Sequence, residues 1–266
     1  MTFWQNVLKI VQDYWPNLLM ACRTTLLVSL LGTACGFLIG LLIGGLRAIR
    51  PDFTASKASR ILKRIFDALA GLYITIFRGT PMMVQAVFIY YALLNIIHWS
   101  NIQAAVFVIS VNTGAYMAEI IRSGIQAVDN GQIEAARSLG MSNAQTLKEV
   151  VLPQAIRNAF PAIGNELIVN IKDSSVLMII SISELMFSAR SIAGTTFRFT
   201  EVYFIEACIY LFLTSVAALL LNWVEKRVNG SGLSLPQSDT DPANMKLSRT
   251  PEQKGGNRDY DARQHS

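Results

Sequence analysis

The segment Leu26–Leu46, LLVSLLGTACGFLIGLLIGGL, contains no charged residue and carries a glycine at every fourth position, at Gly32, Gly36, Gly40 and Gly44. A helix needs about 20 predominantly apolar residues to cross a bilayer of about 30 Å, and this segment is long enough. Residues four apart lie on one face of a helix, so the four glycines form a smooth face without side chains. We therefore predict a membrane-spanning helix against which a second helix packs closely.

The composition of the whole chain is typical of a membrane protein. Hydrophobic residues make up 52% of the 266 residues and charged residues 15%, whereas charged residues are about 25% of a soluble domain. Two further apolar runs, Ala104–Ala118 and Phe204–Trp223, approach or reach the length of a span. The regions Ile65–Ile97 and Ala155–Phe187 are also hydrophobic but are interrupted by polar residues and proline. The predicted fold class is an all-α integral membrane protein.

The number of spans depends on how the region Ile65–Ile97 is interpreted. Two spans broken at Arg78–Pro81 give six in total, and place the basic segment Arg47–Arg64 and the polar segment Gly131–Pro153 on opposite faces. One long element, part of which runs along the cytoplasmic surface, gives five spans and places both segments on one face. Basic residues favour the cytoplasmic side, so the second interpretation is preferred. We predict about five transmembrane helices, with the N-terminus outside and the C-terminus inside.

Three parts of the chain differ in composition. Residues 1–17 place aromatic and aliphatic side chains on one helical stripe, which predicts an amphipathic helix lying in the membrane interface. Residues 18–228 form the predicted transmembrane domain, with a polar hairpin at about residues 129–153. Residues 229–266 are rich in Ser, Gly, Pro, Asp and Gln with little apolar content, which predicts a disordered cytoplasmic tail.

The formal net charge of +5 has its local excess in the segment Arg47–Arg64, beside the first span. Such clusters mark the cytoplasmic side, so the charge indicates topology and does not indicate nucleic acid as a partner. Binding of anionic membrane lipid by the same segment is the alternative interpretation. The cysteines, Cys22, Cys35 and Cys208, lie in apolar stretches and indicate neither a metal site nor a disulfide framework.

The polar hairpin has local signals for two helices and a sharp turn. Gln132–Leu139 favours a helix, and Gly140 suits the left-handed conformation at which a helix stops. Ser142 followed by Gln145 has the form of a capping box that starts a second helix. Pro153 suits the first turn of a third helix that enters the membrane, where its missing N–H costs nothing. From these residues alone, an ordinary amphipathic connector between two spans is the alternative.

The hairpin also carries a spaced motif, which is Glu134-Ala135-Ala136, then after three residues Gly140, and after nine more Val150-x-Leu152-Pro153. This motif resembles the EAA loop of the permease subunits of bacterial ABC importers, whose pattern ends in Ile-x-Leu-Pro. Val150 is a conservative departure from that pattern.

Surrounding motifs narrow the resemblance to the polar amino acid branch, which carries histidine, glutamine, arginine or opines. These motifs are Arg78-Gly79-Thr80-Pro81 with Gln85 and Tyr90-Tyr91, Ala115-Tyr116-x-Ala118-Glu119-x-x-Arg122, Gly131-Gln132, and Lys172-Asp173-Ser174-Ser175-Val176. The last motif departs at two positions from the Lys-Asp-Thr-Ser-Leu of the family. The likeness runs from about Leu18 to Val228 and does not include the tail.

The resemblance implies a multi-pass permease subunit in the cytoplasmic (inner) membrane that moves polar amino acids or opine-like derivatives. It implies separate ATPase subunits that bind ATP and Mg, a second permease subunit, and an extracytoplasmic solute-binding protein, with no cofactor or metal in this chain. The first helix of the loop would seat in a cleft on the ATPase, and Gly140 would fix its angle to the membrane helix. The implied coupling residues are Glu134, Ala135, Ala136, Arg137, Gly140, Leu152 and Pro153. The two alanines would allow close seating, while the two charged residues would make charge-assisted contacts at the rim.

Catalysis by this chain itself is not expected. The sequence has no G-x-x-x-x-G-K-[ST] phosphate loop, and its histidines are His98 and His265 only. We therefore predict a transport subunit and not an enzyme. An ion-coupled secondary transporter, and a membrane assembly factor without transport activity, are the alternatives.

Polar and ionisable residues at membrane depth are candidates for a substrate path. Glu166 lies about 20 Å along the helix that begins at Pro153, and Lys172 and Asp173 lie about 30 Å along it, at a predicted break. An amino acid carries both charges, so groups of both signs suit it. The full set of candidates is Glu166, Asn170, Lys172, Asp173, Asn112, Thr113 and Arg78.

Structural roles are the alternative for several of these candidates. Lys172 and Asp173 can form an internal pair or contact the binding protein, and Arg78 can anchor the break beside Pro81. Glu119 and Arg122, three residues apart at the end of a span, are expected to pair and to stabilise that end.

Overall fold

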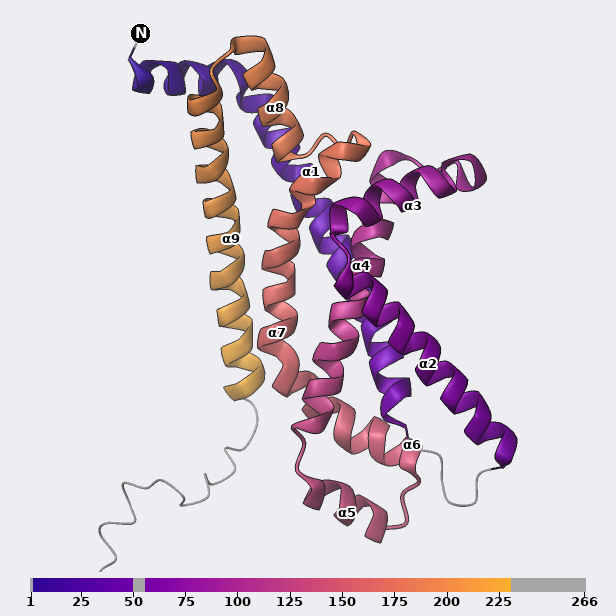
Figure 1. Cartoon of the computed structure of the whole chain (residues 1–266). Coiled ribbons are helices and arrows are strands. Elements are labelled where there is room, and N and C mark those ends of the chain that lie inside the picture. Colours follow the sequence, from indigo (N-terminus) through magenta and orange to yellow (C-terminus); the bar gives the residue numbers. More distant parts are fainter. Residues whose placement is uncertain (1, 50–55, 231–266) are drawn as a thin grey trace, which may run out of the picture. The chain divides into compact units, whose positions relative to one another are not determined.

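The computed structural model describes residues 2–49 and 56–230, and all regular structure within them is helical (Figure 1). The elements are α1 Phe3–Ala48, α2 Lys57–Gly79, α3 Met82–Ile97, α4 Asn101–Gln126, α5 Asn130–Ser138, α6 Asn143–Gln145, the π-helix η1 Thr146–Val151, α7 Leu152–Asp173, the 3-10 helix η2 Ser174–Ile180, α8 Leu185–Thr196 and α9 Phe199–Gly230. The predicted tail lies outside the described residues, apart from its first two.

Three helices of the described residues are long and apolar enough to cross a membrane, and they contain the three apolar runs of the sequence. These are Phe3–Ala48, Asn101–Gln126 and Phe199–Arg227. Two further pairs of helices qualify together, although each pair is bent at a short break. If each bent pair is one span, the count is five, in agreement with the prediction.

The first helix is continuous where the sequence predicts two separate elements. α1 begins with a capping box, in which Thr2 and Gln5 each accept from the other's backbone N–H, and it contains Pro16. Figure 1 shows the N-terminal part of α1 lying across the direction of the remainder. Proline inside a helix removes one hydrogen bond and kinks it, so the predicted interfacial helix and first span are two limbs of one bent helix.

The glycine face of α1 packs directly against α4. A methyl group added at Gly36 would lie 2.7 Å from the Thr113 Cβ, and one at Gly44 would lie 2.8 Å from the Ala118 carbonyl oxygen. A methyl group added at Gly40 would lie 2.7 Å from the backbone carbonyl carbon of Met117 in α4. Real Cβ atoms essentially never approach other heavy atoms below 3.0 Å. The predicted close packing on these glycines is therefore confirmed, with α4 as the second helix.

The region 65–97 is broken at Thr80–Pro81, and α2 and α3 meet at a bend of 115°. The Gln85 side chain holds this bend, because its Nε2 donates to the carbonyl oxygens of Phe77 and Thr80, each at 2.9 Å. The break therefore lies where the six-span interpretation placed it, and the two helices are long and apolar enough for a span only when they are taken together.

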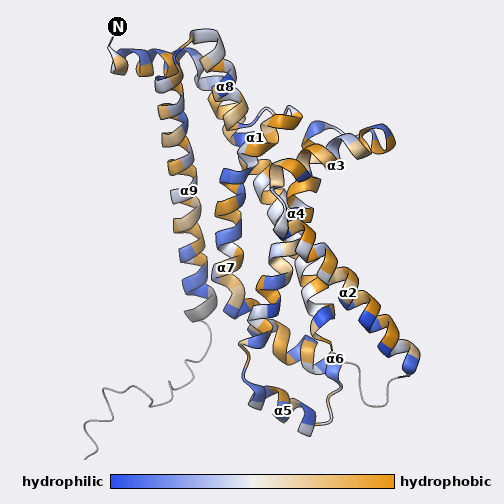
Figure 2. Cartoon of the chain, in the orientation of Figure 1, coloured by the Kyte–Doolittle hydropathy of each residue, from blue (hydrophilic) through white to orange (hydrophobic). Residues whose placement is uncertain are grey.

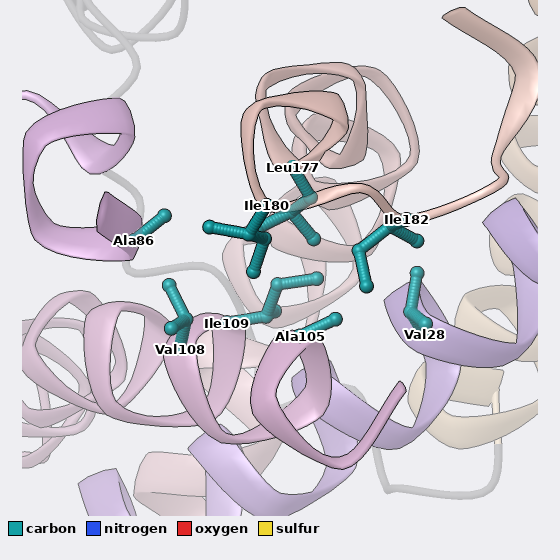
Figure 3. Packing of buried hydrophobic residues seen from close by; sticks show 8 residues of the cluster. All are labelled: Val28, Ala86, Ala105, Val108, Ile109, Leu177, Ile180 and Ile182. Carbon is teal, nitrogen blue, oxygen red and sulfur yellow. The ribbon is translucent and has the colours of Figure 1, made fainter. Parts of the chain in front are cut away.

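The position of α3 differs from the prediction. The charge pattern predicts that the part of residues 65–97 that runs along the membrane surface lies on the same side as the polar hairpin. In the structure α3 packs instead against η2, at the end of α7 that is remote from the hairpin. Figure 3 shows the reason, because Ala86 of α3 joins a buried cluster with Leu177 and Ile180 of η2. Burial of these apolar side chains sets the direction of α3, which the charge pattern alone does not encode.

The long helix after the hairpin changes its geometry where the sequence predicts a break. α7 ends at Asp173, η2 follows as a 3-10 helix, and α8 then departs at a bend of 56°. The Glu184 carboxylate caps α8 by accepting from the backbone N–H groups of Met186, at 2.9 Å, and Phe187, at 2.7 Å. Tyr210 of α9 donates to the same carboxylate at 3.1 Å, so this cap also joins α8 to α9.

We predict that Gly40→Ala lowers the free energy of unfolding by about 1–3 kcal/mol, because the added methyl overpacks the α1–α4 contact. Gly45→Ala is the matched control, since a Cβ there meets nothing within 4 Å. Thermal unfolding of the purified chain in detergent measures both variants. Equal midpoints for Gly40→Ala and Gly45→Ala would show that the glycine face is not a tight contact.

Candidate functional site

The polar hairpin turns at Gly140, which has a φ of +80°. Its N–H donates to the Arg137 carbonyl at 2.9 Å, and the Met141 N–H donates to the Ala136 carbonyl at 3.2 Å. This pair of bonds is a Schellman motif, which satisfies the last carbonyl groups of α5. The predicted helix stop at Gly140 is confirmed.

The second helix of the hairpin begins with the predicted capping box. The Gln145 N–H donates to the Ser142 hydroxyl at 3.3 Å, and the Ser142 N–H donates to the Gln145 side-chain oxygen at 2.9 Å. Arg137 crosses the turn and donates to the Asn143 side-chain oxygen at 3.1 Å. The angle between α5 and α6 is therefore fixed by local hydrogen bonds on both sides of Gly140.

Pro153 lies in the first turn of α7, as predicted, and no gap separates this helix from the second helix of the hairpin. α6, η1 and α7 follow one another without a gap, and Leu152 and Pro153 are the first residues of α7. Proline cannot donate to the preceding turn and its ring crowds the carbonyl four residues earlier. The preceding turn is a π-helix, and the Gln154 side chain donates to the Val150 carbonyl at 3.0 Å. The hairpin is thus joined to the membrane helix by continuous helical backbone.

The short helix α5 has one face toward the membrane helices and one face open. Ala136 is 4% exposed, and Ile133 is half-buried against the cluster at the base of the hairpin. Glu134 and Ala135 are exposed, and Arg137 is also exposed. Of the two alanines, therefore, only Ala135 is open to a partner, and Ala136 packs within this chain.

Leu139 is a residue of this open surface that the motif does not include. It follows α5 directly and is 83% exposed, the largest exposure among the large hydrophobic residues of the described chain. Singly exposed apolar side chains are common on protein surfaces, so this exposure makes Leu139 available to a partner without requiring one. Its position just before the helix-ending glycine, within a polar segment, is the sequence signal that could have identified it.

Arginines gather around Glu119 at the hairpin end of α4. Arg122 donates to the carboxylate from Nε at 3.0 Å and from Nη2 at 2.8 Å, so the predicted pairing is confirmed. Arg47 of α1 lies 3.5 Å and Arg78 of α2 lies 3.9 Å from the same carboxylate. Arg78 also stacks over the Tyr116 ring at 5.4 Å. This cluster joins the ends of three helices and supports the anchoring role for Arg78.

Three candidates for the substrate path are buried and engaged with other helices. Asn170 is 2% exposed, and its Nδ2 donates to the hydroxyls of Thr33, at 2.8 Å, and Thr113, at 2.9 Å. Asn112 donates to the Gln85 side-chain oxygen at 2.8 Å, which supports the bend between α2 and α3. In this structure, Asn112, Thr113 and Asn170 tie helices together and are not open to a path.

The remaining candidates lie on the open side of α7. Lys172 and Asp173 are exposed, and Glu166 is half-buried. Glu166 and Asp173 are two helical turns apart, about 10 Å, and therefore lie on the same face. Figure 2 shows hydrophilic residues along α7 between the more apolar α4 and α9. A polar face at membrane depth is costly in lipid, so it requires either water or a further protein surface.

The geometry suits mechanical transmission and solute contact. Within residues 2–49 and 56–230, no three His, Cys, Asp or Glu side chains gather as metal ligands would. The hairpin offers an exposed helix, a fixed turn and a continuous connection to a helix with an open polar face. A force applied to α5 can therefore reach α7.

The family described as "Binding-protein-dependent transport system inner membrane component" matches residues 36–230. The Escherichia coli (strain K12) glutamine transport system permease protein GlnP is 36% identical over 216 residues, which cover 80% of this chain and 93% of that protein. The nopaline transport system permease protein NocM of Agrobacterium fabrum is 35% identical over 233 residues, covering 84% and 92%.

Solved structures have the same fold. The crystal structure of an amino acid ABC transporter with histidines superposes with a TM-score of 0.70 at 38% identity, covering 83% of this chain and 97% of that one. An inward-facing MetNI methionine ABC transporter superposes with a TM-score of 0.69 at 22% identity. The chain belongs to the family of inner membrane components of binding-protein-dependent transport systems.

Proposed function

We propose that this chain is the membrane-spanning permease subunit of an ABC importer for polar amino acids or opine-like derivatives. The observation that carries the proposal is the hairpin, whose exposed helix α5 is joined through a fixed turn and continuous helix to α7. Relatives named for glutamine and nopaline transport support the substrate class. An ion-coupled secondary transporter would need no such docking helix.

The coupling surface consists of the open side of α5 and the residue that follows it. Glu134 and Arg137 offer charged groups, Ala135 allows a close approach, and Leu139 offers an apolar anchor. An apolar centre with a charged rim is the usual composition of a protein interface. The partner is a separate ATPase subunit that binds ATP and Mg. The hairpin is then cytoplasmic, with the N-terminus outside and the C-terminus inside.

The open polar face of α7 supports a second permease subunit. Glu166 and Asp173 would meet lipid if this chain were alone in the membrane. A copy of the chain, or a paralogue, covers this face and encloses a path between the two subunits. Glu166, Lys172 and Asp173 line that path, since together they offer both charges to the ammonium and carboxylate of an amino acid. A solute-binding protein delivers the substrate from outside.

We expect an ATPase subunit to co-purify with the chain, and uptake by reconstituted vesicles to be inhibited by vanadate. Leu139→Ser should weaken the association about tenfold or more, because hot-spot residues contribute about 2 kcal/mol when truncated. The measurement is the amount of ATPase retained on the affinity-tagged chain. Uptake that resists vanadate and follows an ion gradient would instead establish the secondary transporter.

We expect Gly140→Val to uncouple ATP hydrolysis from uptake, because a β-branched residue cannot adopt a φ of +80° without strain. The subunit should still insert, since the turn lies outside the spans. Gly140→Asn is the matched control, because asparagine tolerates the left-handed conformation. The measurement is the ratio of ATP hydrolysed to amino acid imported, which should rise about tenfold or more for valine only. Normal transport by Gly140→Val would exclude a hinge role.

We expect Glu166→Gln and Asp173→Asn to reduce uptake about tenfold at normal expression, because each removes a charge from the path. Asp13→Asn, on the exposed first limb of α1, is the control for loss of one carboxylate. Uptake of labelled amino acid into whole cells measures all three. If neither path variant differs from the control, these two residues do not line the path.

A further inference from the structure

A pocket of about 560 Å³ lies between the hairpin and the ends of α1 and α4. Its walls come from the C-terminal end of α1, α2, the end of α4, α5, α6 and η1. Pockets for small molecules occupy roughly 300–1,000 Å³, so this one has the size of a ligand site. It shares Arg137 with the coupling surface, and it does not include the polar face of α7.

The polar side of the pocket carries an excess of positive charge. Arg47, Arg122 and Arg137 line it, and each comes from a different helix. Asp67 also lines the pocket, but both of its carboxylate oxygens accept from Lys63, at 2.5 and 2.7 Å. Glu119 pairs with two of these arginines, Arg47 and Arg122. The three arginines and Lys63 are therefore four cations, against the two carboxylates of Asp67 and Glu119. A net positive pocket favours an anion.

Most of the guanidinium donors remain for a ligand. A guanidinium has five N–H groups. A bidentate contact and one further hydrogen bond together use about three of them. Among the described residues, Arg122 uses two on Glu119, Arg47 uses one on the same carboxylate, and Arg137 uses one on Asn143. The pocket is therefore lined by guanidinium groups from three helices, which can donate to a carboxylate or a phosphate.

A buried hydroxyl lies beside the pocket. Thr146 is among the lining residues and is only 3% exposed, and its hydroxyl has no hydrogen-bond partner among the described residues. Leaving a buried hydroxyl unpaired costs about 1–3 kcal/mol.

Apolar side chains line the same pocket. Ile125, Ile133, Leu147 and Val151 are among the lining residues, and they belong to the hydrophobic cluster at the base of the hairpin. A fully hydrated ion would leave these side chains uncovered, whereas a hydrocarbon group would be buried against them. The ligand that fits this mixed lining is a compact carboxylate or phosphate joined to a small apolar body.

We propose that this pocket is a regulatory site for such an amphiphilic anion, which ties α5 to the membrane-spanning helices. The site includes Ile133 and Arg137 of α5 and residues of α1, α4 and η1, so a bound ligand contacts the coupling helix and its support together. The regulatory part rests on the proposed coupling function of α5. Two sources supply this chemistry, a soluble organic acid of the cytoplasm and the headgroup region of an anionic phospholipid.

Hydrogen exchange of the α5 backbone, residues 130–138, tests binding without any ATPase. The full chain is placed in nanodiscs of phosphatidylcholine, and 4-methylpentanoate is added as the soluble probe. In a second arm the nanodiscs contain phosphatidylglycerol and no soluble acid. Exchange should slow about tenfold when the ligand is at about ten times its Kd, since bound ligand stabilises the closed form by mass action. The arm that responds identifies the source.

Two variants test the location. Gln126→Glu places a carboxylate on an exposed residue of the pocket wall and should abolish the slowing. Gln12→Glu adds the same charge on the exposed first limb of α1 and should leave it unchanged. If neither arm slows exchange in the unmodified chain, or if both Glu variants abolish it equally, the proposal is overturned.

The reconstituted complex separates this inference from the coupling function. If the probe slows α5 exchange and changes the ratio of ATP hydrolysed to substrate imported, the regulatory role is supported. If exchange slows but no ATPase associates with the chain, the pocket stands and the coupling function fails. A third outcome is that transport is coupled normally and the probe slows hydrogen exchange of α5, but the ratio of ATP hydrolysed to substrate imported does not change. Regulation through this pocket is then excluded.

Discussion

The rest of the structure depends on the contact between α1 and α4, which is possible only because α1 presents glycine at every fourth residue. Gly36, Gly40 and Gly44 allow the α4 backbone and β-carbons to approach within distances that any side chain would block. In a membrane, lipid tails are as apolar as the helices, so close packing and hydrogen bonds hold helices together. With α4 fixed in this way, its polar side chains reach partners on the other helices.

The polar groups at membrane depth then fall into two classes. Thr113 and Asn112 of α4 pair with Asn170 and Gln85, and these pairs join α7 and the α2–α3 bend to the centre. Such bonds are stabilising because an unpaired polar group in hydrocarbon is costly. The groups on the open side of α7 have no comparable burial. The first class holds one subunit together, and the second class, in our proposal, faces a second subunit and the solute.

The hairpin obtains its rigidity from a different source, which is local backbone chemistry. The Schellman motif at Gly140 and the capping box at Ser142 fix the turn with short-range hydrogen bonds. Continuous helix then runs from Asn143 to Ile180 through the π-helical turn before Pro153. In the proposed coupling function, a turn that holds its angle and a helix without a gap convert displacement of α5 into tilt of α7. The pocket behind α5 lies where a small molecule could alter this connection.

The sequence alone determined the apolar spans, the glycine face, the helix stop at Gly140 and the capping box at Ser142, because each rests on residues within one or two helical turns of each other. Its motif spacing also identified the family. Only the tertiary structure decided that Ala136 packs inward, that Asn170 joins three helices and that α3 turns toward η2. Those outcomes depend on which surfaces meet across long sequence distances. Local propensity and charge pattern do not encode that choice, and burial and hydrogen bonding between distant helices make it.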